Sequence, residues 1–133
     1  MSCPATVSLL GRSILVVEDE YLIATEVMHW LQETGAEVVG PVPRVDRALD
    51  LVEDHRLDAA VLDINLGDGD NSFPIADRLE MLWVPYLFAT GHGAKAKAAG
   101  YTDPPVLVKP YSKADLLRTL MDLIAASARP AGP

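Results

Sequence analysis

Residues 13–20 read Ser-Ile-Leu-Val-Val-Glu-Asp-Glu, an apolar run that ends abruptly in three acids. Aliphatic and β-branched residues favour a strand, and a strand without alternating polar residues is typical of a parallel sheet buried on both faces. The stretch therefore predicts a central strand over Ser13–Val17, with Glu18 and Asp19 directly beyond its carboxyl end.

Four more apolar runs predict strands of the same kind. They lie at residues 37–40, 59–62, 85–89 and 106–108, and Pro41 and Pro43 are expected to end the first of them. Between the runs, apolar residues recur at helical spacing. The helices are expected at about residues 20–34, 45–52, 74–82 and 112–124, with a short or poorly ordered one between Gly93 and Gly100. Alternating strands and helices indicate an α/β fold, with a parallel sheet between two helical layers.

Single residues mark the ends and the faces of these helices. Gly35 is expected to stop the first helix, because glycine readily adopts the left-handed conformation found at helix C-termini. Ser112 is expected to cap the last helix, with Asp115 three positions further on. The inward faces are expected to carry Ile75, Leu79 and Leu82 in the helix after Pro74, and Leu116, Leu117, Leu120, Leu123 and Ile124 in the last helix.

The composition of the 133-residue chain fits one domain. Half of the residues are hydrophobic, and 19 acids against 11 Lys and Arg give a net charge of −8. Such a chain is a poor partner for nucleic acid or for anionic membranes. Cys3 is its one cysteine, which predicts no internal disulfide and a reducing, cytoplasmic location. We expect an N-terminal extension at residues 1–12, the domain at 13–126 and a flexible tail at 127–133.

Four of the five predicted strands end in polar or charged residues that can bind a ligand or take part in a reaction. Glu18 and Asp19 follow the first strand, Asp63 the third, Thr90 the fourth and Lys109 the fifth. The carboxyl ends of parallel strands lie on one edge, and ligands of open α/β sheets bind beyond that edge. A single charged residue after a strand is most often an ordinary loop residue, but four such strand ends together favour a functional site.

These residue types suit phosphoryl chemistry. Three carboxylates at one point repel one another and need a cation. Because only oxygen ligands are offered, Mg²⁺ (or Mn²⁺) is the expected ion, held by Glu18, Asp19 and Asp63. A carboxylate beside such an ion can attack a phosphoryl group and form an aspartyl phosphate. Lys109 and Thr90 can then neutralise and position the phosphoryl oxygens.

Other ligand-binding patterns fit less well. A calcium loop that starts at Asp63 has Gly67 at its fifth position and Pro74 where an EF-hand needs Glu. Residues 91–96 lack the third glycine of a dinucleotide fingerprint. A flavin-binding domain of the same fold class needs a phosphate-binding loop after its first strand, where three acids would repel phosphate. His92 is interpreted first as an exposed loop histidine, and second as a contact to a phosphoryl oxygen.

At its polar strand ends the chain resembles the receiver domain of two-component response regulators. The resemblance covers about residues 14–124 and rests on Val17-Glu18-Asp19-Glu20, Asp63-Ile64-Asn65, Ala89-Thr90-Gly91 and Lys109-Pro110. It implies a flavodoxin-like (βα)5 fold, a doubly wound parallel sheet with strand order 2-1-3-4-5. It further implies that Asp63 is the phosphoacceptor and that the Lys109–Pro110 peptide bond is cis.

The resemblance also implies the roles of the surrounding residues. The metal ligands are Glu18, Asp19, Asp63 and the backbone carbonyl of Asn65. Thr90 and Lys109 contact the phosphoryl group. The string Phe88-Ala89-Thr90-Gly91-His92-Gly93, followed by Lys109-Pro110-Tyr111, is similar to a stand-alone receiver subgroup with a Phe-Ala-Thr-Gly-x-Gly signature, known mainly in alphaproteobacteria.

The chain departs from typical receivers at Val106, where the family usually has a Tyr or Phe that moves with the Thr. A switch would then use Tyr111, or ordering of the segment that starts with Gly91, His92 and Gly93 and ends at Gly100. In this hypothesis phosphorylation orders the segment, because Thr90 and backbone donors gain an anion to bind.

The expected function is that of a single-domain response regulator. It accepts a phosphoryl group from a sensor histidine kinase or phosphotransfer protein and signals to a downstream protein target, with no nucleic acid or membrane partner. It is expected not to be an enzyme beyond Mg-dependent self-phosphorylation and slow autodephosphorylation. The resemblance places the partner surface, and the option of a homodimer, on strand four, residues 91–100, strand five and the last helix. A phosphorylation-independent adaptor and a phosphate sink remain the alternatives.

Overall fold

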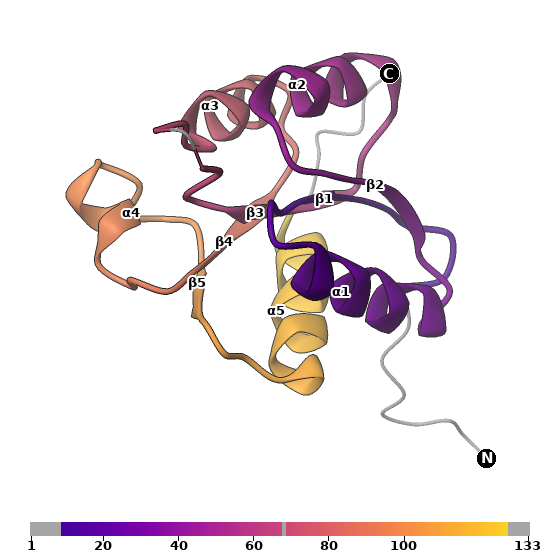
Figure 1. Ribbon diagram of the computed structural model, residues 1–133. Helices are drawn as coiled ribbons and strands as arrows, with labels where there is room; N and C mark the ends of the chain where they lie inside the picture. Colours follow the sequence, from indigo (N-terminus) through magenta and orange to yellow (C-terminus); the bar gives the residue numbers. More distant parts are fainter. Residues whose placement is uncertain (1–8, 68, 128–133) are drawn as a thin grey trace.

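The structure is a computed structural model that describes residues 9–67 and 69–127, and its five strands form one parallel sheet in the order β2-β1-β3-β4-β5 (Figure 1). The strands are β1 (Ser13–Val17), β2 (Glu37–Val42), β3 (Ala59–Asp63), β4 (Tyr86–Thr90) and β5 (Val106–Val108). The helices are α1 (Tyr21–Glu33), α2 (Val45–Asp54), α3 (Phe73–Met81), α4 (Lys95–Ala98) and α5 (Lys113–Ala126). The fold class and the strand order predicted from the sequence are confirmed.

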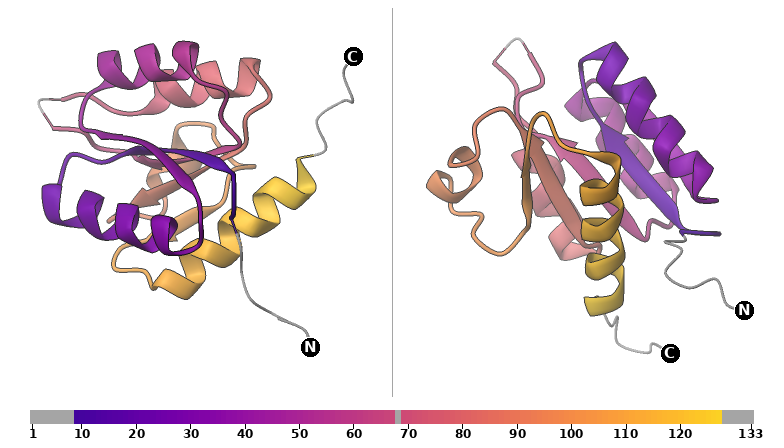
Figure 2. Two further views of the ribbon diagram at one scale, coloured as in Figure 1. Left: turned by 90° about the vertical axis from the view of Figure 1, so that its right-hand side faces the viewer. Right: turned by 90° about the horizontal axis from the view of Figure 1, so that it is seen from below.

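Helices cover both faces of the sheet, with α1 and α5 on one face and α2 and α3 on the other (Figures 1 and 2). Successive strand residues point to opposite faces, so β1 gives Ile14 and Val16 to one core and Leu15 and Val17 to the other. Full burial of each such side chain stabilises the fold by about 1.5–3 kcal/mol. The double burial explains why the strands lack polar alternation.

Strand β2 runs two residues past Gly40, so the prediction that Pro41 ends it is wrong. The pairing with β1 shifts between Leu15 and Val17, and the Gly40–Pro41 peptide bond is cis. A proline is tolerated here because β2 is the edge strand, where one side of the backbone needs no donor. Gly40 has φ +94°, and a Cβ there would lie 2.9 Å from the Val16 carbonyl oxygen.

Two predicted helix signals are confirmed, whereas some of the predicted inward residues are less buried than expected. Gly35 has φ +87° and follows the end of α1, and Ser112 Oγ accepts a 3.0 Å hydrogen bond from the Asp115 amide. The inward placement of Leu82 is wrong, because α3 ends at Met81 and leaves Leu82 39% exposed. In the last turns of α5, Leu123 and Ile124 are half-buried rather than buried.

Packing begins before the first strand. Leu9 is 1% exposed, lies in the core beneath α1 and α5, and donates its amide to the Thr34 carbonyl at 3.1 Å. The described part of the predicted extension, residues 9–12, is therefore packed against the domain. Residues 1–8 and the predicted tail at 128–133 lie outside the described residues. Within the described part, no helix combines the length and the apolar character that a membrane span requires.

Candidate functional site

Three acids gather at the carboxyl ends of β1 and β3. Ligand oxygens of Glu18, Asp19 and Asp63 all lie within 4.8 Å of one another. Glu18 and Asp63 are buried, whereas Asp19 is exposed. The parallel pairing of β1 with β3 brings these residues together although 44 positions separate Asp19 from Asp63 (63 − 19). The cluster is thus buried on one side and open to solvent on the other.

Lys109 closes the buried side of the acid cluster. Its Nζ lies 3.0 Å from Glu18 Oε1, 3.4 Å from Asp63 Oδ1 and 3.4 Å from Glu20 Oε1. The Lys109 amide donates to the Thr90 carbonyl at 2.8 Å, which ties the residue after β5 to the end of β4. Burial lowers the pKa of the Lys109 ammonium, but the hydrogen bond with Glu18 and the neighbouring carboxylate charges outweigh it and raise the pKa overall.

Asp63 is the acid whose ionisation the surroundings oppose most. Burial raises its pKa to about 8, with further contributions from the Glu18 charge and from contacts with Glu18 and Asp19, which Lys109 only partly offsets. A carboxyl held protonated by its neighbours ionises readily once a cation neutralises them. With three carboxylates as ligands, the donor set fits a hard divalent cation that keeps several waters.

Thr90 ends β4 and is fully buried. Its Oγ1 accepts a 3.1 Å hydrogen bond from the His92 amide and lies 3.5 Å from the His92 carbonyl oxygen. The hydroxyl therefore holds the first turn of the segment that leaves the sheet toward α4. His92 itself is exposed.

The loop after β3 is closed by backbone contacts and approaches Asp19 at Gly67. Asn65 forms an isolated antiparallel bridge with Asn71, and the Leu66 amide donates to the Asp70 carbonyl at 3.0 Å. Gly67 has φ +81°, and a Cβ there would lie 3.6 Å from Asp19 Oδ2. The loop is thus a neighbour of the exposed acid.

The structure separates the residues predicted for a switch. Gly91, His92 and Gly93 are exposed, and Val106 is half-buried against the core beneath α2 and α3. Tyr111 lies on the other side of the sheet, where its ring meets Trp30 of α1 edge-on at 6.3 Å. Burial raises the pKa of Tyr111 to about 12. The Lys109–Pro110 peptide bond is cis, as the resemblance implies.

Sequence reasoning missed two residues that hold the α4 region. Tyr101 stacks on Phe73 at 4.7 Å, meets Phe88 edge-on at 5.6 Å and donates its hydroxyl to Asp77. Lys95, the first residue of α4, donates its ammonium to Asn65 Oδ1. No sequence pattern marks either residue, because both contacts join segments more than 20 positions apart.

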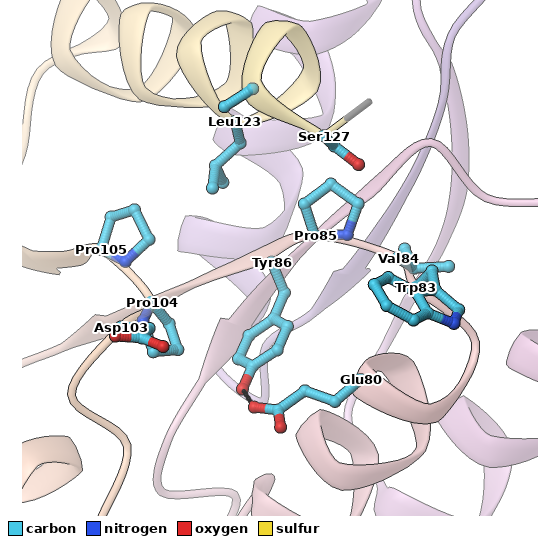
Figure 3. Close-up of a pocket in the computed structure, with 11 residues that line it drawn as sticks. Glu80, Trp83, Val84, Pro85, Tyr86, Asp103, Pro104, Pro105, Leu123 and Ser127 are labelled. Atoms are coloured by element: carbon cyan, nitrogen blue, oxygen red, sulfur yellow. Dashed lines mark hydrogen bonds between the residues drawn. The ribbon is translucent and has the colours of Figure 1, made fainter. Parts of the chain in front are cut away.

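A groove of about 380 Å³ lies at the opposite end of the strands (Figure 3). Pro85, which precedes β4, and Pro105, which precedes β5, contribute to its wall, and Tyr86 donates its hydroxyl to Glu80 there. Trp83 lies beside it and is 70% exposed. This groove is remote from the acid cluster, which lies at the carboxyl ends of the strands.

The family model described as Response regulator receiver domain matches residues 14–121. The chain belongs to this family. Receiver domains serve two-component signal transduction, and the match spans all five strands except Ser13, together with most of α5.

Solved structures of other proteins have the same fold. The solution structure of SdrG from Sphingomonas melonis Fr1 is 39% identical, with a TM-score of 0.73, and the match covers 88% of this chain and 98% of that one. The receiver domain of Erythrobacter litoralis PhyR superimposes with a TM-score of 0.82 over 94% of this chain and 98% of that one, at 20% identity.

The curated relatives that match are longer proteins. The sensory transduction protein LytT of Bacillus cereus is 34% identical over 111 residues, which are 80% of this chain and 45% of LytT. The chain thus spans about half the length of the curated relatives it matches, and the receiver part is what they share.

Proposed function

We propose that this receiver domain accepts a phosphoryl group on Asp63 and so changes its interaction with a downstream protein. The observation that carries the proposal is the acid cluster itself. Asp63 lies within 4.8 Å of the two other acids and 3.4 Å from the Lys109 ammonium, at the edge where α/β sheets bind ligands.

The chemistry is the transfer of a phosphoryl group to a carboxylate. An Asp63 carboxylate oxygen attacks the phosphorus of a phosphohistidine, a new P–O bond forms, and the P–N bond breaks with its electron pair leaving on the imidazole. The imidazole then takes a proton from solvent. A sensor histidine kinase or a phosphotransfer protein is the proposed donor, and small phosphodonors such as acetyl phosphate can replace it.

The other residues of the site position and neutralise the transferred group. Lys109 is proposed to move from its carboxylate partners to one phosphoryl oxygen, because the new dianion competes for its ammonium. Thr90 is proposed to donate its hydroxyl hydrogen to a second oxygen in place of its present 3.5 Å contact with the His92 carbonyl oxygen. Thr90 ends β4 and Lys109 directly follows β5, and these two strands are neighbours in the sheet.

A divalent ion completes the site. Mg²⁺ (or Mn²⁺) is proposed to be held by Glu18, Asp19, Asp63 and the backbone carbonyl of Asn65, and when bound it neutralises charge on the phosphoryl oxygens. The donor chemistry supports this assignment, since three clustered carboxylates offer only oxygen ligands and share one ammonium.

The signal is proposed to leave the domain through protein contacts in the cytoplasm. The proposed surface comprises β4, residues 91–100, β5 and α5. Thr90 is the last residue of β4 and Lys109 directly follows β5. Val108 on β5 is 50% exposed and offers this surface an apolar contact for a target protein or for a second copy of the chain. The stand-alone receiver subgroup, with its Phe-Ala-Thr-Gly-x-Gly signature, is part of this proposal.

The alternative is an adaptor that keeps the receiver fold and signals without phosphorylation. Val106 favours this alternative, because it has no ring to follow a movement of Thr90. Retention of a phosphoryl group without any change in partner binding would indicate a phosphate sink.

One experiment separates these functions. The chain is incubated with acetyl phosphate in Mg²⁺ or in EDTA, and its intact mass is measured. A gain of one phosphoryl group in Mg²⁺ only, absent from Asp63→Asn, supports the proposed function. The absence of any gain in the wild-type chain would favour the adaptor. Pull-downs with phosphorylated and unphosphorylated protein then separate a switch from a sink.

A further inference from the structure

The contact between Lys95 and Asn65 joins α4 to the loop after β3. The Lys95 ammonium donates to Asn65 Oδ1 across 30 positions of sequence, and both residues are exposed. Asn65 lies two residues beyond Asp63, so their Cα atoms are at most about 7 Å apart. The contact therefore brings a second, exposed lysine to the loop that directly follows the candidate phosphoacceptor.

The present partner of Lys95 is weak for a cation. Asn65 Oδ1 is a neutral acceptor at the surface, and an exposed lysine keeps much of its freedom on a flexible four-carbon stem. A phosphoryl group on Asp63 would add a charge of about −1.5 to −2 and three strong acceptor oxygens at this end of the sheet. Charge-assisted hydrogen bonds are stronger than bonds to a neutral amide, so the ammonium gains by changing partner.

The position of α4 is fixed well enough for this exchange. Ala96 is fully buried, and the Tyr101 amide donates to the Ala96 carbonyl at 2.9 Å. Tyr101 in turn stacks on Phe73. The helix is thus anchored on its inner side, and the side chain of Lys95 can swing while the backbone stays in place.

We propose that Lys95 is a further phosphoryl-contacting residue, which holds Asn65 in the unphosphorylated protein and moves to a phosphoryl oxygen once Asp63 is phosphorylated. This inference rests on the proposed function. It also connects phosphorylation to α4 without an aromatic residue at position 106, where this chain has Val106.

The test measures binding of beryllofluoride, a noncovalent mimic of the phosphoryl group on an aspartate, in the presence of Mg²⁺. Lys95→Met removes both the charge and the donor. Lys95→Gln removes the charge but keeps a donor for Asn65. Lys97→Met is the matched control, because residues 95 and 97 of one helix point about 160° apart, and Lys97 is equally an exposed lysine of α4.

Both Lys95 variants are expected to weaken beryllofluoride binding about twofold to fivefold, the size of an exposed ion pair, whereas Lys97→Met stays within about 1.5-fold of wild type. In the wild-type protein, the side-chain amide resonances of Asn65 are expected to shift on beryllofluoride binding as Lys95 departs. In Lys95→Met, these resonances should already lie apart from their wild-type position before the ligand is added. Circular dichroism confirms that each variant is folded.

Two outcomes would overturn the inference while leaving the proposed function intact. One is equal binding by Lys95→Met and Lys97→Met. The other is normal binding by Lys95→Gln beside weak binding by Lys95→Met, which would make Lys95 a mere tether of Asn65. If the wild-type chain binds no beryllofluoride and gains no phosphoryl group from acetyl phosphate, the proposed function itself fails.

Discussion

At the scale of single residues, the site has more negative charge than the half-buried ammonium of Lys109 offsets. Glu18 and Asp63 share Lys109, and Asp19 adds a third carboxylate within 4.8 Å. A buried pair of like charges costs stability unless one group keeps its proton. The raised pKa of Asp63 expresses this cost, and stability should therefore depend on pH and on divalent cations.

The pH dependence of metal-free stability tests the charge at Asp63. Its pKa is about 8 in the folded chain and about 4 in the unfolded chain. Between these values the unfolded state binds fewer protons at this residue, so its contribution makes the free energy of unfolding fall as pH rises, and it levels off above pH 8. Asp63→Asn removes this contribution and is expected to be more stable than wild type at pH 8 by at least about 1 kcal/mol. Urea unfolding in EDTA from pH 5 to 9 measures both chains, and parallel curves would contradict the assignment.

Divalent cations should offset the loss of stability that the clustered carboxylates cause. Mg²⁺ binds the folded state only, so it raises the free energy of unfolding by RT ln(1 + [Mg²⁺]/Kd), about 2.7 kcal/mol at 100 times Kd. Asp19→Asn is expected to lose most of this gain, because it removes the exposed ligand of the cluster. Asp122→Asn, an exposed acid on α5, is the control for net charge. Thermal melts with and without Mg²⁺ measure the stabilisation in each variant. An equal stabilisation of Asp19→Asn and Asp122→Asn would mean that Mg²⁺ binds elsewhere.

At the scale of elements, the strands were more predictable than their contacts. Ser13–Val17 and Val106–Val108 were predicted to the residue, because continuous apolar runs between polar strand ends leave little choice of boundary. Pro41 was wrongly expected to end β2, since an edge position is a property of the whole sheet. Leu82 has helical spacing but lies one residue beyond α3, and a helix end is set by tertiary packing as much as by spacing.

The positive φ of Gly40 in β2 gives a prediction of its own. Gly40→Ala is expected to destabilise the fold by about 1–3 kcal/mol, because alanine is strained at φ +94° and its Cβ would lie 2.9 Å from the Val16 carbonyl oxygen. Gly91→Ala is the control: its Cβ would meet nothing within 4 Å and its φ is not in the left-handed region. Urea unfolding compares the two, and equal midpoints would contradict the expectation.

The segment between β4 and β5 is the element expected to respond to phosphorylation. Its ends are held by Thr90 at one side and by Tyr101, stacked on Phe73, at the other. Phosphorylation should slow amide hydrogen exchange in residues 91–103, because Thr90 and backbone donors gain an anion. Unchanged exchange there, with full phosphorylation shown by mass, would remove this segment from the switch.

At the scale of the whole molecule, the candidate site could be predicted because topology brings strand ends together. Glu18, Asp63, Thr90 and Lys109 were assigned from their places after apolar runs, and the structure gathers them at one edge of the sheet. The contacts of Lys95 and Tyr101 could not be predicted, since side-chain contacts between loops and short helices depend on packing that no local pattern encodes. The same packing decides that Tyr111 faces α1.

Chemical mapping of the phosphoryl group tests the central claim most directly. The chain is phosphorylated with acetyl phosphate and Mg²⁺, and borohydride then reduces any aspartyl phosphate to homoserine, which tandem mass spectrometry locates in the sequence. If Asp63 is the phosphoacceptor, homoserine appears at position 63 and nowhere else. Homoserine at another aspartate, or none in a folded chain that binds Mg²⁺, would contradict the assignment.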